Sequence, residues 1–311
     1  MANFGFVFPG QGSQSVGMLK ELSEQYSVIK DTFAEASEVL GYDLFDLVMN
    51  GPAEELGKTY KTQPALLTAS VALYRLWQEK TSLKPAVMAG HSLGEYSALV
   101  CAGVIDFKDA VKLVKLRGEY MQAAVPLGVG AMAAVIGLAD DVVIKACAEA
   151  SGSQVCSAVN FNSPGQVVIA GNKEAVEAAS EALKAAGAKR VLPLPVSVPS
   201  HCALMKSAAD ELAKELAKVE FKAPSVPVIN NVDVAKVEDA AAIKDALVRQ
   251  LYSPVRWVET VQSASADGIK TMIEVGPGKV LAGLIKRIDK EVNAISLNDA
   301  ATLEAALAAV A

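Results

Sequence analysis

A serine between two glycines is the first residue in the chain whose setting suggests chemistry. The run Gly90-His91-Ser92-Leu93-Gly94 follows an apolar stretch at 85–90 and precedes a helical pattern over 93–102. A strand–turn–helix setting of this kind is typical of a nucleophile elbow, whose tight turn needs small flanking residues. We therefore predict that Ser92 carries an acyl group and that the Leu93 amide faces the developing oxyanion. One structural alternative stays open, because Ser92 to Glu95 also fits an S-x-x-E capping box.

The chain contains only two histidines that could activate this serine. A serine hydroxyl is a poor nucleophile without a base within hydrogen-bond reach. His91 adjoins Ser92, but the turn directs neighbouring side chains apart, so we predict that His201 is the base. No Asp or Glu stands out as a third member. A backbone carbonyl or an Asn could orient the imidazole instead, and the turn at Gln250–Pro254 could supply such a carbonyl.

An arginine lies on the apolar side of the predicted helix 108–121. At 100° per residue, Arg117 falls within the arc formed by Ala110, Leu113, Val114 and Met121. A buried guanidinium is costly unless it is paired. Two interpretations follow: a structural ion pair with a buried carboxylate, or a bidentate receptor for a carboxylate on the substrate. We assign Met121, on the same arc, to the substrate-binding residues with Arg117.

A glycine-rich loop, Phe8–Gln14, follows the first predicted strand. It lacks the spacing and the Lys of a phosphate-binding loop. A loop at the carboxyl end of a strand can instead offer a backbone amide to the oxyanion formed at Ser92, and Gln11 is the candidate. A plain tight turn is the alternative.

Composition limits the class of protein. The chain has 311 residues, 52% of them hydrophobic, and a formal net charge of −6. It can therefore bury one large or two modest cores, and its charge argues against binding of nucleic acid. Its four cysteines lack CxxC or zinc-ligand spacing, so we predict no metal site and a reducing compartment. No signal peptide or apolar run of ~20 residues stands out, which predicts a cytoplasmic protein without a membrane span.

The order of predicted elements favours an α/β fold with a parallel sheet. Strands are expected at 4–8, 85–90, 226–231, 270–275 and 292–297, with helices at 16–49, 63–80, 93–102, 107–123, 203–218, 239–251, 279–289 and 302–310. A different order interrupts this pattern. Strands at 130–138, 154–161, 165–171 and 189–197 combine with helices at 140–150 and 173–186 into βαββαβ, the ferredoxin-like pattern. We predict a main domain of 1–126 and 199–311 with a small inserted subdomain at 127–198.

Six motifs occur along the chain in a fixed order. They are Phe8-Pro-Gly-Gln-Gly-Ser-Gln14, Gly90-His-Ser-Leu-Gly-Glu95, Leu116-Arg-Gly-Glu-Tyr-Met-Gln122, Asn160-Phe-Asn-Ser-Pro-Gly-Gln166, Ser200-His201 and Glu274-Val-Gly-Pro-Gly278. Together they resemble the malonyl-CoA:acyl carrier protein transacylases of bacterial fatty acid synthesis, over nearly the whole chain. The resemblance implies an α/β-hydrolase-like domain that carries a ferredoxin-like insert, in agreement with the pattern of elements.

The resemblance also implies an activity and roles. Malonyl would pass from malonyl-CoA to the phosphopantetheine thiol of holo-acyl carrier protein through malonyl-Ser92, in a ping-pong reaction. CoA and phosphopantetheine would be substrates, so no cofactor is implied. The implied roles are His201 as base, Gln11 and Leu93 amides as oxyanion hole, Arg117 as receptor of the malonyl carboxylate, the Gln250 carbonyl as orienting group for His201, and Asn160 and Asn162 as lining of the thioester or pantetheine channel.

One departure concerns Ser200. Many malonyl-selective domains of polyketide synthases have Phe directly before the histidine, whereas the stand-alone bacterial enzymes tolerate Ser, so malonyl is retained as the acyl group. The carrier protein is acidic by family expectation, and it could dock on the basic residues Lys189, Arg190, Lys286 and Arg287. We expect a monomer. Two other functions stay open: a serine esterase or thioesterase, and a non-catalytic interaction protein with a decayed site.

Overall fold

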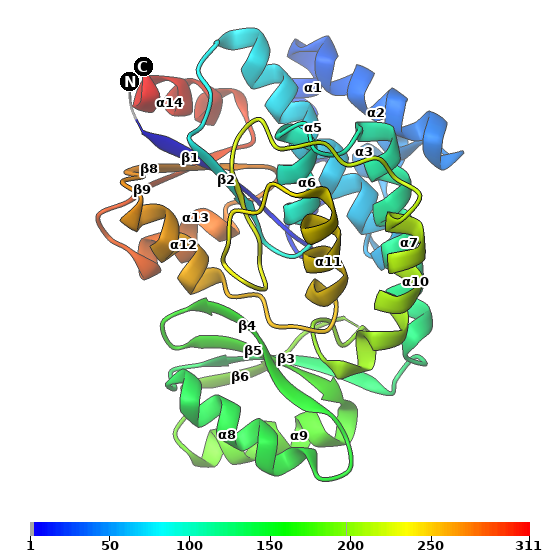
Figure 1. The fold of residues 1–311 in the computed structure, drawn as a ribbon, viewed down its shortest axis with the longest axis vertical. Coiled ribbons are helices and arrows are strands. Elements are labelled where there is room, and N and C mark those ends of the chain that lie inside the picture. Colours follow the sequence, from blue (N-terminus) through cyan, green and yellow to red (C-terminus); the bar gives the residue numbers. More distant parts are fainter. Residues whose placement is uncertain (1–2, 197) are drawn as a thin grey trace.

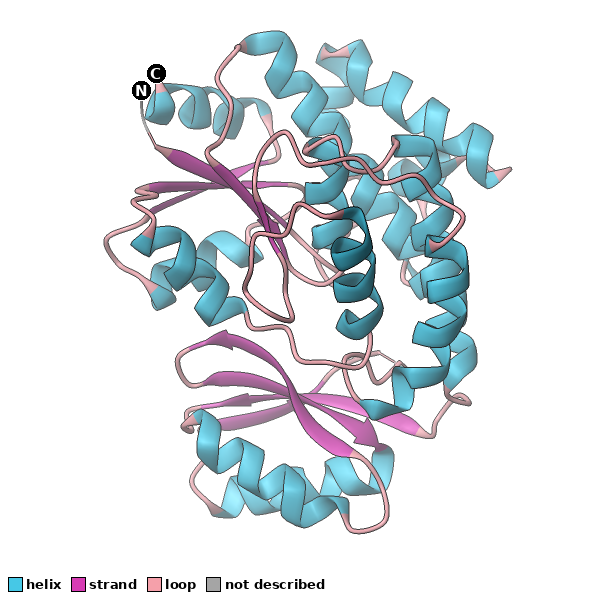
Figure 2. Ribbon diagram, in the orientation of Figure 1, coloured by secondary structure: helices cyan, strands magenta, loops and turns pink. Residues whose placement is uncertain are grey.

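Five parallel strands form the larger of two sheets. The structure, a computed structural model, describes residues 3–196 and 198–311. The strands are β1 (Phe4–Phe8), β2 (Val87–Gly90), β7 (Val228–Ile229), β8 (Thr271–Val275) and β9 (Asn293–Leu297), in the order β7-β2-β1-β8-β9 (Figures 1 and 2). Every residue of β1 and β2 is buried. Such uninterrupted burial is typical of central parallel strands covered on both faces.

Alternate side chains of β1 belong to different cores. Phe4, Phe6 and Phe8 contribute to the core that holds helix α5 (Thr59–Lys80), and the Phe6 ring lies edge-on to Trp77 at 5.2 Å. Val7 contributes to the opposite core, with α12 (Trp257–Ala266) and α13 (Val280–Ile288). Helices on both faces therefore bury the sheet, as the period of two in a strand requires.

The core around α5 gathers most of the remaining helices. Buried residues of α2, α7, α10, α11 and α14 belong to it. The further helices are α1 (Lys20–Gln25), α2 (Ser27–Leu40), α3 (Leu44–Asn50), α4 (Ala53–Leu56), α6 (Gly94–Cys101), α7 (Phe107–Ala124), α10 (Lys206–Leu216), α11 (Ala240–Gln250) and α14 (Ala300–Val310). Within the described residues, no helix combines the length and the apolar character that crossing a membrane demands.

A separate antiparallel sheet forms the lower part of the molecule in Figure 1. Its strands are β3 (Gly130–Ile136), β4 (Cys156–Ser163), β5 (Gln166–Asn172) and β6 (Arg190–Pro193), in the order β4-β5-β3-β6. Helices α8 (Asp140–Ser151) and α9 (Lys173–Ala185) cover one face. This is the βαββαβ arrangement of a ferredoxin-like unit. The predicted fold class, a parallel α/β sheet with a ferredoxin-like unit, is confirmed.

The other face of the small sheet lies against the site region. Met132, Val159, Val168 and Ala170 form a cluster there with Cys202. The chain near Val255 also joins the sheet edge: the Phe161 N–H donates to the Val255 carbonyl at 3.1 Å, and the Val255 N–H donates to the Val159 carbonyl at 2.8 Å. These contacts hold the small sheet against the segment that precedes α10 and the segment that follows α11.

Several predicted boundaries were wrong. The helical pattern at 16–49 is three helices, because extended backbone at Tyr26 separates α1 from α2 and left-handed backbone at Gly41 (φ 75°) ends α2. The predicted helix 63–80 begins earlier, at Thr59, so that Pro64 lies inside α5. The predicted strand 226–231 is only two residues long. The helix expected at 203–218 begins with a 3₁₀ turn, Ala203–Met205, before α10.

Two further differences concern the ends of predicted elements and a missed helix. The strand expected at 189–197 extends in the structure only over Arg190–Pro193, and position 197 lies outside the described residues. Helix α12 was not predicted. Its buried residues Trp257, Val261 and Ala264 have helical spacing, but polar Glu, Thr, Gln and Ser residues fill the positions between them and dilute the pattern.

Candidate active site

Three loops at the carboxyl edge of the parallel sheet supply the site. Gln11 follows β1, Ser92 follows β2, and Asn231 follows β7. Strands β7, β2 and β1 are consecutive neighbours in the sheet. The carboxyl ends of parallel strands lie at one edge, which is where α/β proteins bind their ligands. Residues far apart in the sequence therefore come together around Ser92.

The turn at Ser92 has the geometry of a nucleophile elbow. Ser92 has a positive φ of 52°, which is uncommon for a residue with a side chain. The flanking glycines are required by close packing. A Cβ atom on Gly90 would lie 1.9 Å from the carbonyl carbon of Gly94, and one on Gly94 would lie 2.0 Å from the Phe8 carbonyl oxygen. The serine is thus held in a strained turn between β2 and α6.

The alternative of a capping box at Ser92 was wrong. The N-cap of α6 is Leu93, and no side chain caps the helix. Ser92 Oγ lies 2.8 Å from His201 Nε2, and the Glu95 carboxylate accepts hydrogen bonds from distant residues instead of from the Ser92 amide. Both polar side chains of the S-x-x-E pattern therefore point to other parts of the chain.

His201 joins Ser92 to α11. Its Nδ1 lies 2.7 Å from the Gln250 carbonyl oxygen, which can only accept, so Nδ1 carries a proton and donates. Burial, reinforced by the positive charge of Arg117, lowers the pKa of His201 to about 3. The imidazole is therefore neutral, and its Nε2 accepts the Ser92 hydroxyl proton in a hydrogen bond. His201 also has a positive φ, 64°, so strained backbone occurs at both members of the pair.

The other histidine points away from Ser92. His91 Nε2 lies 2.8 Å from Asn162 Oδ1, and its ring lies 5.5 Å from that of Trp257. Burial lowers the pKa of His91. The expectation that the turn separates the two adjacent side chains agrees with this geometry. The structure places Asn162 behind His91 rather than on the cavity beside Ser92.

Arg117 is buried, with 1% of its surface exposed, and it lies beside Ser92. Its Nη1 donates to Gln63 Oε1 at 2.8 Å, and its Nη2 donates to Gln250 Oε1 at 2.9 Å and to Ser92 Oγ at 3.2 Å. Burial lowers the pKa of Arg117. Among the described residues no carboxylate forms an ion pair with it. The alternative of a direct structural ion pair was therefore wrong, and the guanidinium is held by neutral amides.

A cavity of about 110 Å³ opens at this point. Its lining residues are Gln11, His91, Ser92, Leu93, Arg117, Met121, Met132, Asn160, Leu194, Val196, Val198, Ser200 and His201. A second cavity of about 510 Å³ shares Gln11 and Val196 with it and extends along Lys58–Tyr60 and Val125–Leu127. Seven of the nine predicted site residues therefore line the small cavity; Gln250 supports it through His201, and Asn162 supports it through His91.

Unpartnered polar groups point to a ligand in the small cavity. The backbone N–H groups of Gln11 and Leu93 have no hydrogen-bond partner among residues 3–196 and 198–311. The Asn160 Oδ1 atom is buried and likewise lacks a partner within the described chain. A buried polar group without a partner is costly, so such groups are expected where a substrate completes the bonding.

Sequence reasoning missed three residues that hold the site. Asn231 accepts from the Ser92 N–H at 2.8 Å, and Gln63 holds Arg117 and donates to Met121 Sδ at 3.5 Å. The sequence pattern assigns Glu95 only to a possible capping box, although its carboxylate accepts hydrogen bonds from Asn231 and Gln250. The repeated Asn at 230–231, directly after an apolar run, was the available signal for a polar group at the sheet edge.

The four basic residues proposed for docking lie near one another. Arg190 and Gln166 both pair with Ile136 in the small sheet, and the Arg287 Nη1 donates to Gln166 Oε1 at 3.0 Å. Lys189 precedes Arg190, Lys286 precedes Arg287, and all four are exposed. No group of three or more His, Cys, Asp and Glu side chains could hold a metal ion in the part of the chain that the structure describes.

Fold and site together define an α/β protein with a serine–histidine pair at the edge of a parallel sheet. The chain belongs to the acyl transferase domain family, whose model matches residues 5–304. It is therefore an acyltransferase. It is 66% identical to a malonyl CoA-acyl carrier protein transacylase of Salmonella typhimurium over 307 residues, 99% of each chain.

Solved structures show the same likeness. An acyl carrier protein S-malonyltransferase from Vibrio cholerae is 66% identical, with a TM-score of 0.96 over 98% of this chain and 100% of that chain. A malonyl-transacylase in complex with a type II PKS acyl-carrier protein is 61% identical, with a TM-score of 0.98 over 99% of this chain and 100% of that chain. Both cover the parallel sheet and the small sheet.

Proposed function

We propose that the protein transfers malonyl from malonyl-CoA to the phosphopantetheine thiol of holo-acyl carrier protein, for fatty acid biosynthesis. The observation that carries this proposal is Arg117, a buried guanidinium without a carboxylate partner among the described residues, 3.2 Å from Ser92 Oγ. A neighbouring cation of this kind suits an acyl group with a free carboxylate at its far end. The similarity to named malonyl transacylases over the full chain supports the same substrate.

The reaction follows a ping-pong course. Ser92 Oγ attacks the thioester carbonyl carbon, and its proton passes to His201 Nε2, which lies 2.8 Å away. The carbon–sulfur bond then breaks, and the proton returns from His201 to the sulfur of CoA. Malonyl stays on Ser92 as an ester. The phosphopantetheine thiol of the carrier protein attacks this ester, gives its proton to His201, and leaves as a thioester while Ser92 recovers its proton.

The N–H groups of Gln11 and Leu93 stabilise the oxyanion in both halves of the reaction. Each such donor typically contributes roughly 3–4 kcal/mol to the stability of the transition state. The Gln250 carbonyl holds the Nδ1–H of His201 and so fixes the tautomer that exposes a basic Nε2. Asn160 and Met121 line the acyl cavity, and Asn162 orients His91 at its border.

Binding of the malonyl carboxylate also affects the basicity of His201. In the free protein burial, and in addition the charge of Arg117, lowers the pKa of His201. A malonyl carboxylate on Arg117 offsets this charge, so the imidazolium that forms during attack is less unfavourable. An acetyl group has no carboxylate and leaves the charge of Arg117 in place. The same contact thus selects the acyl group and assists proton transfer.

Intact-protein mass spectrometry tests the reaction. Incubation with malonyl-CoA should add one malonyl group to the wild-type protein and none to Ser92→Ala, and holo-acyl carrier protein should remove it. Steady release of free malonate without transfer would instead favour a hydrolase. In a second arm, Arg117→Ala should lose malonyl transfer while Ser92 remains open to acylation by acetyl-CoA. Undiminished malonyl transfer by this variant would contradict the carboxylate-receptor role.

The carrier protein needs a surface on which to dock. Lys189, Arg190, Lys286 and Arg287 form the docking surface for the carrier protein, and their charge reversal should weaken transfer to it while sparing acylation by malonyl-CoA. Equal loss of both reactions would contradict docking there. We also propose a cytoplasmic monomer without a bound cofactor, divided into a main domain of 1–126 and 199–311 and a small subdomain of 127–198.

A further inference from the structure

Two side-chain amides hold the backbone of Ser92 from opposite sides. The Ser92 N–H donates to Asn231 Oδ1 at 2.8 Å, and the Ser92 carbonyl accepts from Gln250 Nε2 at 3.0 Å. Asn231 Nδ2 also donates to the Gly90 carbonyl at 2.6 Å. The positive φ of Ser92 is costly and persists only where the surroundings over-determine it. These amides are the groups that impose it.

A single buried carboxylate joins the two amide residues. Glu95 Oε2 accepts from the Asn231 backbone N–H at 3.0 Å and from Gln250 Nε2 at 2.9 Å. The side chain lies in the first turn of α6 and is 2% exposed. No cation contacts it directly among the described residues, although the charge of the buried Arg117 acts on it, and it caps no helix. Its contacts are therefore directed at the residues that hold Ser92.

The same carboxylate fixes the direction of the Gln250 amide. Gln250 Oε1 accepts from Arg117 Nη2 at 2.9 Å, whereas its Nε2 faces Glu95, Asn231 and Ser92. A carboxylate can only accept, so it keeps the NH₂ end of this amide on its own side. Gln250 also offers its backbone carbonyl to His201. Glu95 is thus connected through one residue to the nucleophile, the base and the buried guanidinium.

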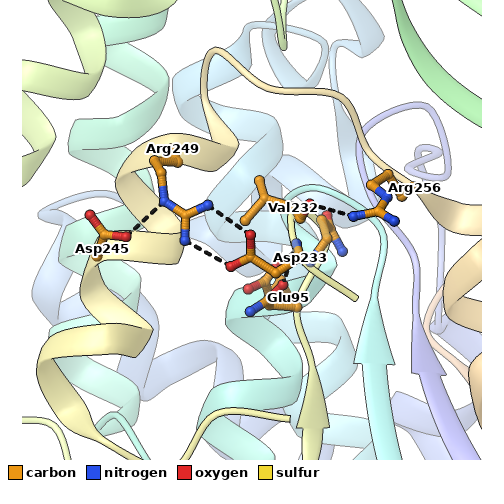
Figure 3. Close-up of polar contacts among 8 residues, drawn as sticks. Glu95, Val232, Asp233, Asp245, Arg249 and Arg256 are labelled. Carbon is orange, nitrogen blue, oxygen red and sulfur yellow. Dashed lines mark hydrogen bonds and ion pairs between the residues drawn. The ribbon is translucent and has the colours of Figure 1, made fainter. Parts of the chain in front are cut away.

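We infer that Glu95 is a positioning residue, which holds Ser92 in its reactive conformation through Asn231 and Gln250. This inference rests on the proposed acyl transfer. An outer clamp holds the Asn231 loop in place: Arg249 donates to both oxygens of Asp233 at 2.9 and 2.7 Å and to Asp245 at 2.7 Å (Figure 3). Figure 3 draws Glu95 together with this clamp.

The fold contains a matched control, Glu274 in β8. Its carboxylate is also buried and also accepts a backbone hydrogen bond, from the Ala282 N–H at 2.8 Å. It touches none of the residues that hold Ser92 within the described chain. Substitutions at Glu95 and Glu274 therefore each remove a buried carboxyl, and only those at Glu95 should affect Ser92.

The test measures the single-turnover acylation of Ser92 by malonyl-CoA, per folded molecule, over a range of donor concentrations. Glu95→Ala should lower the maximal rate about 100-fold, since small misplacements of reacting groups cost this much, with little change in the half-saturating concentration. Glu95→Gln keeps an oxygen acceptor and should retain the rate within about fivefold. Glu274→Ala should lower the unfolding temperature, and neither Glu274→Ala nor Glu274→Gln should lower the rate.

Two milder variants, Glu95→Asp and Glu274→Asp, serve if Glu95→Ala does not fold. Glu95→Asp keeps the charge and withdraws the carboxylate by one methylene, and it should lower the maximal rate about tenfold, whereas Glu274→Asp should not. Rates unchanged in both Glu95→Ala and Glu95→Asp, or lowered equally by the Glu274 substitutions, would overturn the inference. Failure of malonyl-CoA to acylate the wild-type protein would instead overturn the proposed function.

A stability measurement tests the inference without any reaction. Ser92→Gly removes the steric penalty of the positive φ and should raise the unfolding temperature. If Glu95 holds Ser92 in a strained conformation, Glu95→Asp should lower the unfolding temperature by a different amount in the Ser92→Gly background than in the wild type. Additive effects of the two substitutions would contradict this coupling.

Discussion

Two strand–turn–helix units of the parallel sheet are built alike and used differently. In the β2–α6 unit, Glu95 at the start of the helix follows Gly90 and Gly94. In the β8–α13 unit, Glu274 near the end of the strand precedes Gly276 and Gly278. Burial raises the pKa of each of these carboxyls to about 7. The partners differ. Glu274 binds an amide eight positions away in its own unit, whereas Glu95 binds residues 136 and 155 positions away.

The β2–α6 turn differs from the β8–α13 turn in the distance along the chain to its hydrogen-bond partners. A local hydrogen bond such as that of Glu274 stabilises the start of a helix and needs nothing else from the fold. The bonds of Glu95 form only when β7 and α11 are already in place, so they link the Ser92 turn to Gln250, the partner of His201. The reactive turn is therefore the one whose polar groups are satisfied by distant segments.

The largest effect should come from the distant partner of the reactive turn. His201→Ala removes the imidazole that lies 2.8 Å from Ser92 Oγ and is placed to take its proton, so acylation by malonyl-CoA should fall by at least on the order of 10⁴-fold. Rapid-quench mass spectrometry measures the rate. Lys279→Ala, an exposed substitution in the β8–α13 turn, should leave it unchanged. A fall of less than about 100-fold in His201→Ala would show that the reactive turn does not depend on this partner.

Alanine in place of a glycine should have opposite effects in the two helices. In α6, a Cβ atom on Gly94 would meet the Phe8 carbonyl at 2.0 Å, so Gly94→Ala should lower the free energy of unfolding by about 3 kcal/mol. In α13, Gly283 has no atom near its Cβ position, and Gly283→Ala should raise it by about 0.5–1 kcal/mol. Urea denaturation gives both values. Equal effects would mean that the elbow is not tightly packed.

The two buried carboxyls should respond alike to pH. Each has a pKa near 7 in the folded protein and near 4.5 when unfolded, so the folded protein holds more protons between these values. Raising the pH through this window therefore lowers the stability of the wild type. Glu95→Gln and Glu274→Gln lack the titrating group and so lack this loss. The free energy of unfolding of each variant, relative to the wild type at the same pH, should therefore rise by up to roughly 1.4 kcal/mol per pH unit.

Denaturation from about pH 4.5 to 7 measures these gains. Glu304→Gln, on the exposed side of α14, should follow the wild type throughout. A gain for Glu274→Gln without one for Glu95→Gln would show that Glu95 is already ionised at low pH in the folded protein. The two turns would then differ in charge as well as in the distance to their partners.

The smallest effect should come from the outer clamp of the reactive turn. Arg249 and Asp233 are partly exposed, so water screens their attraction, and Arg249→Ala should cost only about 0.5–1 kcal/mol of stability. The acylation rate should fall less than threefold, because Glu95 still holds Asn231. Lys214→Ala, which breaks an exposed pair with Glu211 on α10, is the control. A larger fall in rate would place the clamp, rather than Glu95, in control of the loop.

The fold class and part of the site followed from local patterns. Continuous apolar runs, such as that of β1, predict buried parallel strands, and the βαββαβ order predicts the small sheet. The Gly-x-Ser-x-Gly run identified Ser92 because tight turns need glycine, and the scarcity of histidines left His201 as the base. Arg117 stood out because a charge on an apolar arc demands a partner.

Other site residues had little local signal, and the Asn pair at 230–231 indicated no more than a polar group at the sheet edge. Asn231, Gln63 and Glu95 are ordinary polar residues in sequence, and their positions at the site depend on which strands are neighbours in the sheet. The short strand β7 is two residues long, so its periodicity could not place Asn231. The S-x-x-E pattern left open a capping box between Ser92 and Glu95, whereas the fold turns the Glu95 side chain toward α11.

Local patterns were enough to locate the turn that holds Ser92, the residue types that can act there, and the order of the strands and helices. These properties depend on steric limits and hydrophobic periods that act over a few residues. The folded chain alone shows the partners of His91 and His201, the amides that hold Arg117, and the contacts of Glu95 with Asn231 and Gln250. These hydrogen bonds join groups 54 to 155 positions apart, and such groups meet only once the sheet is assembled.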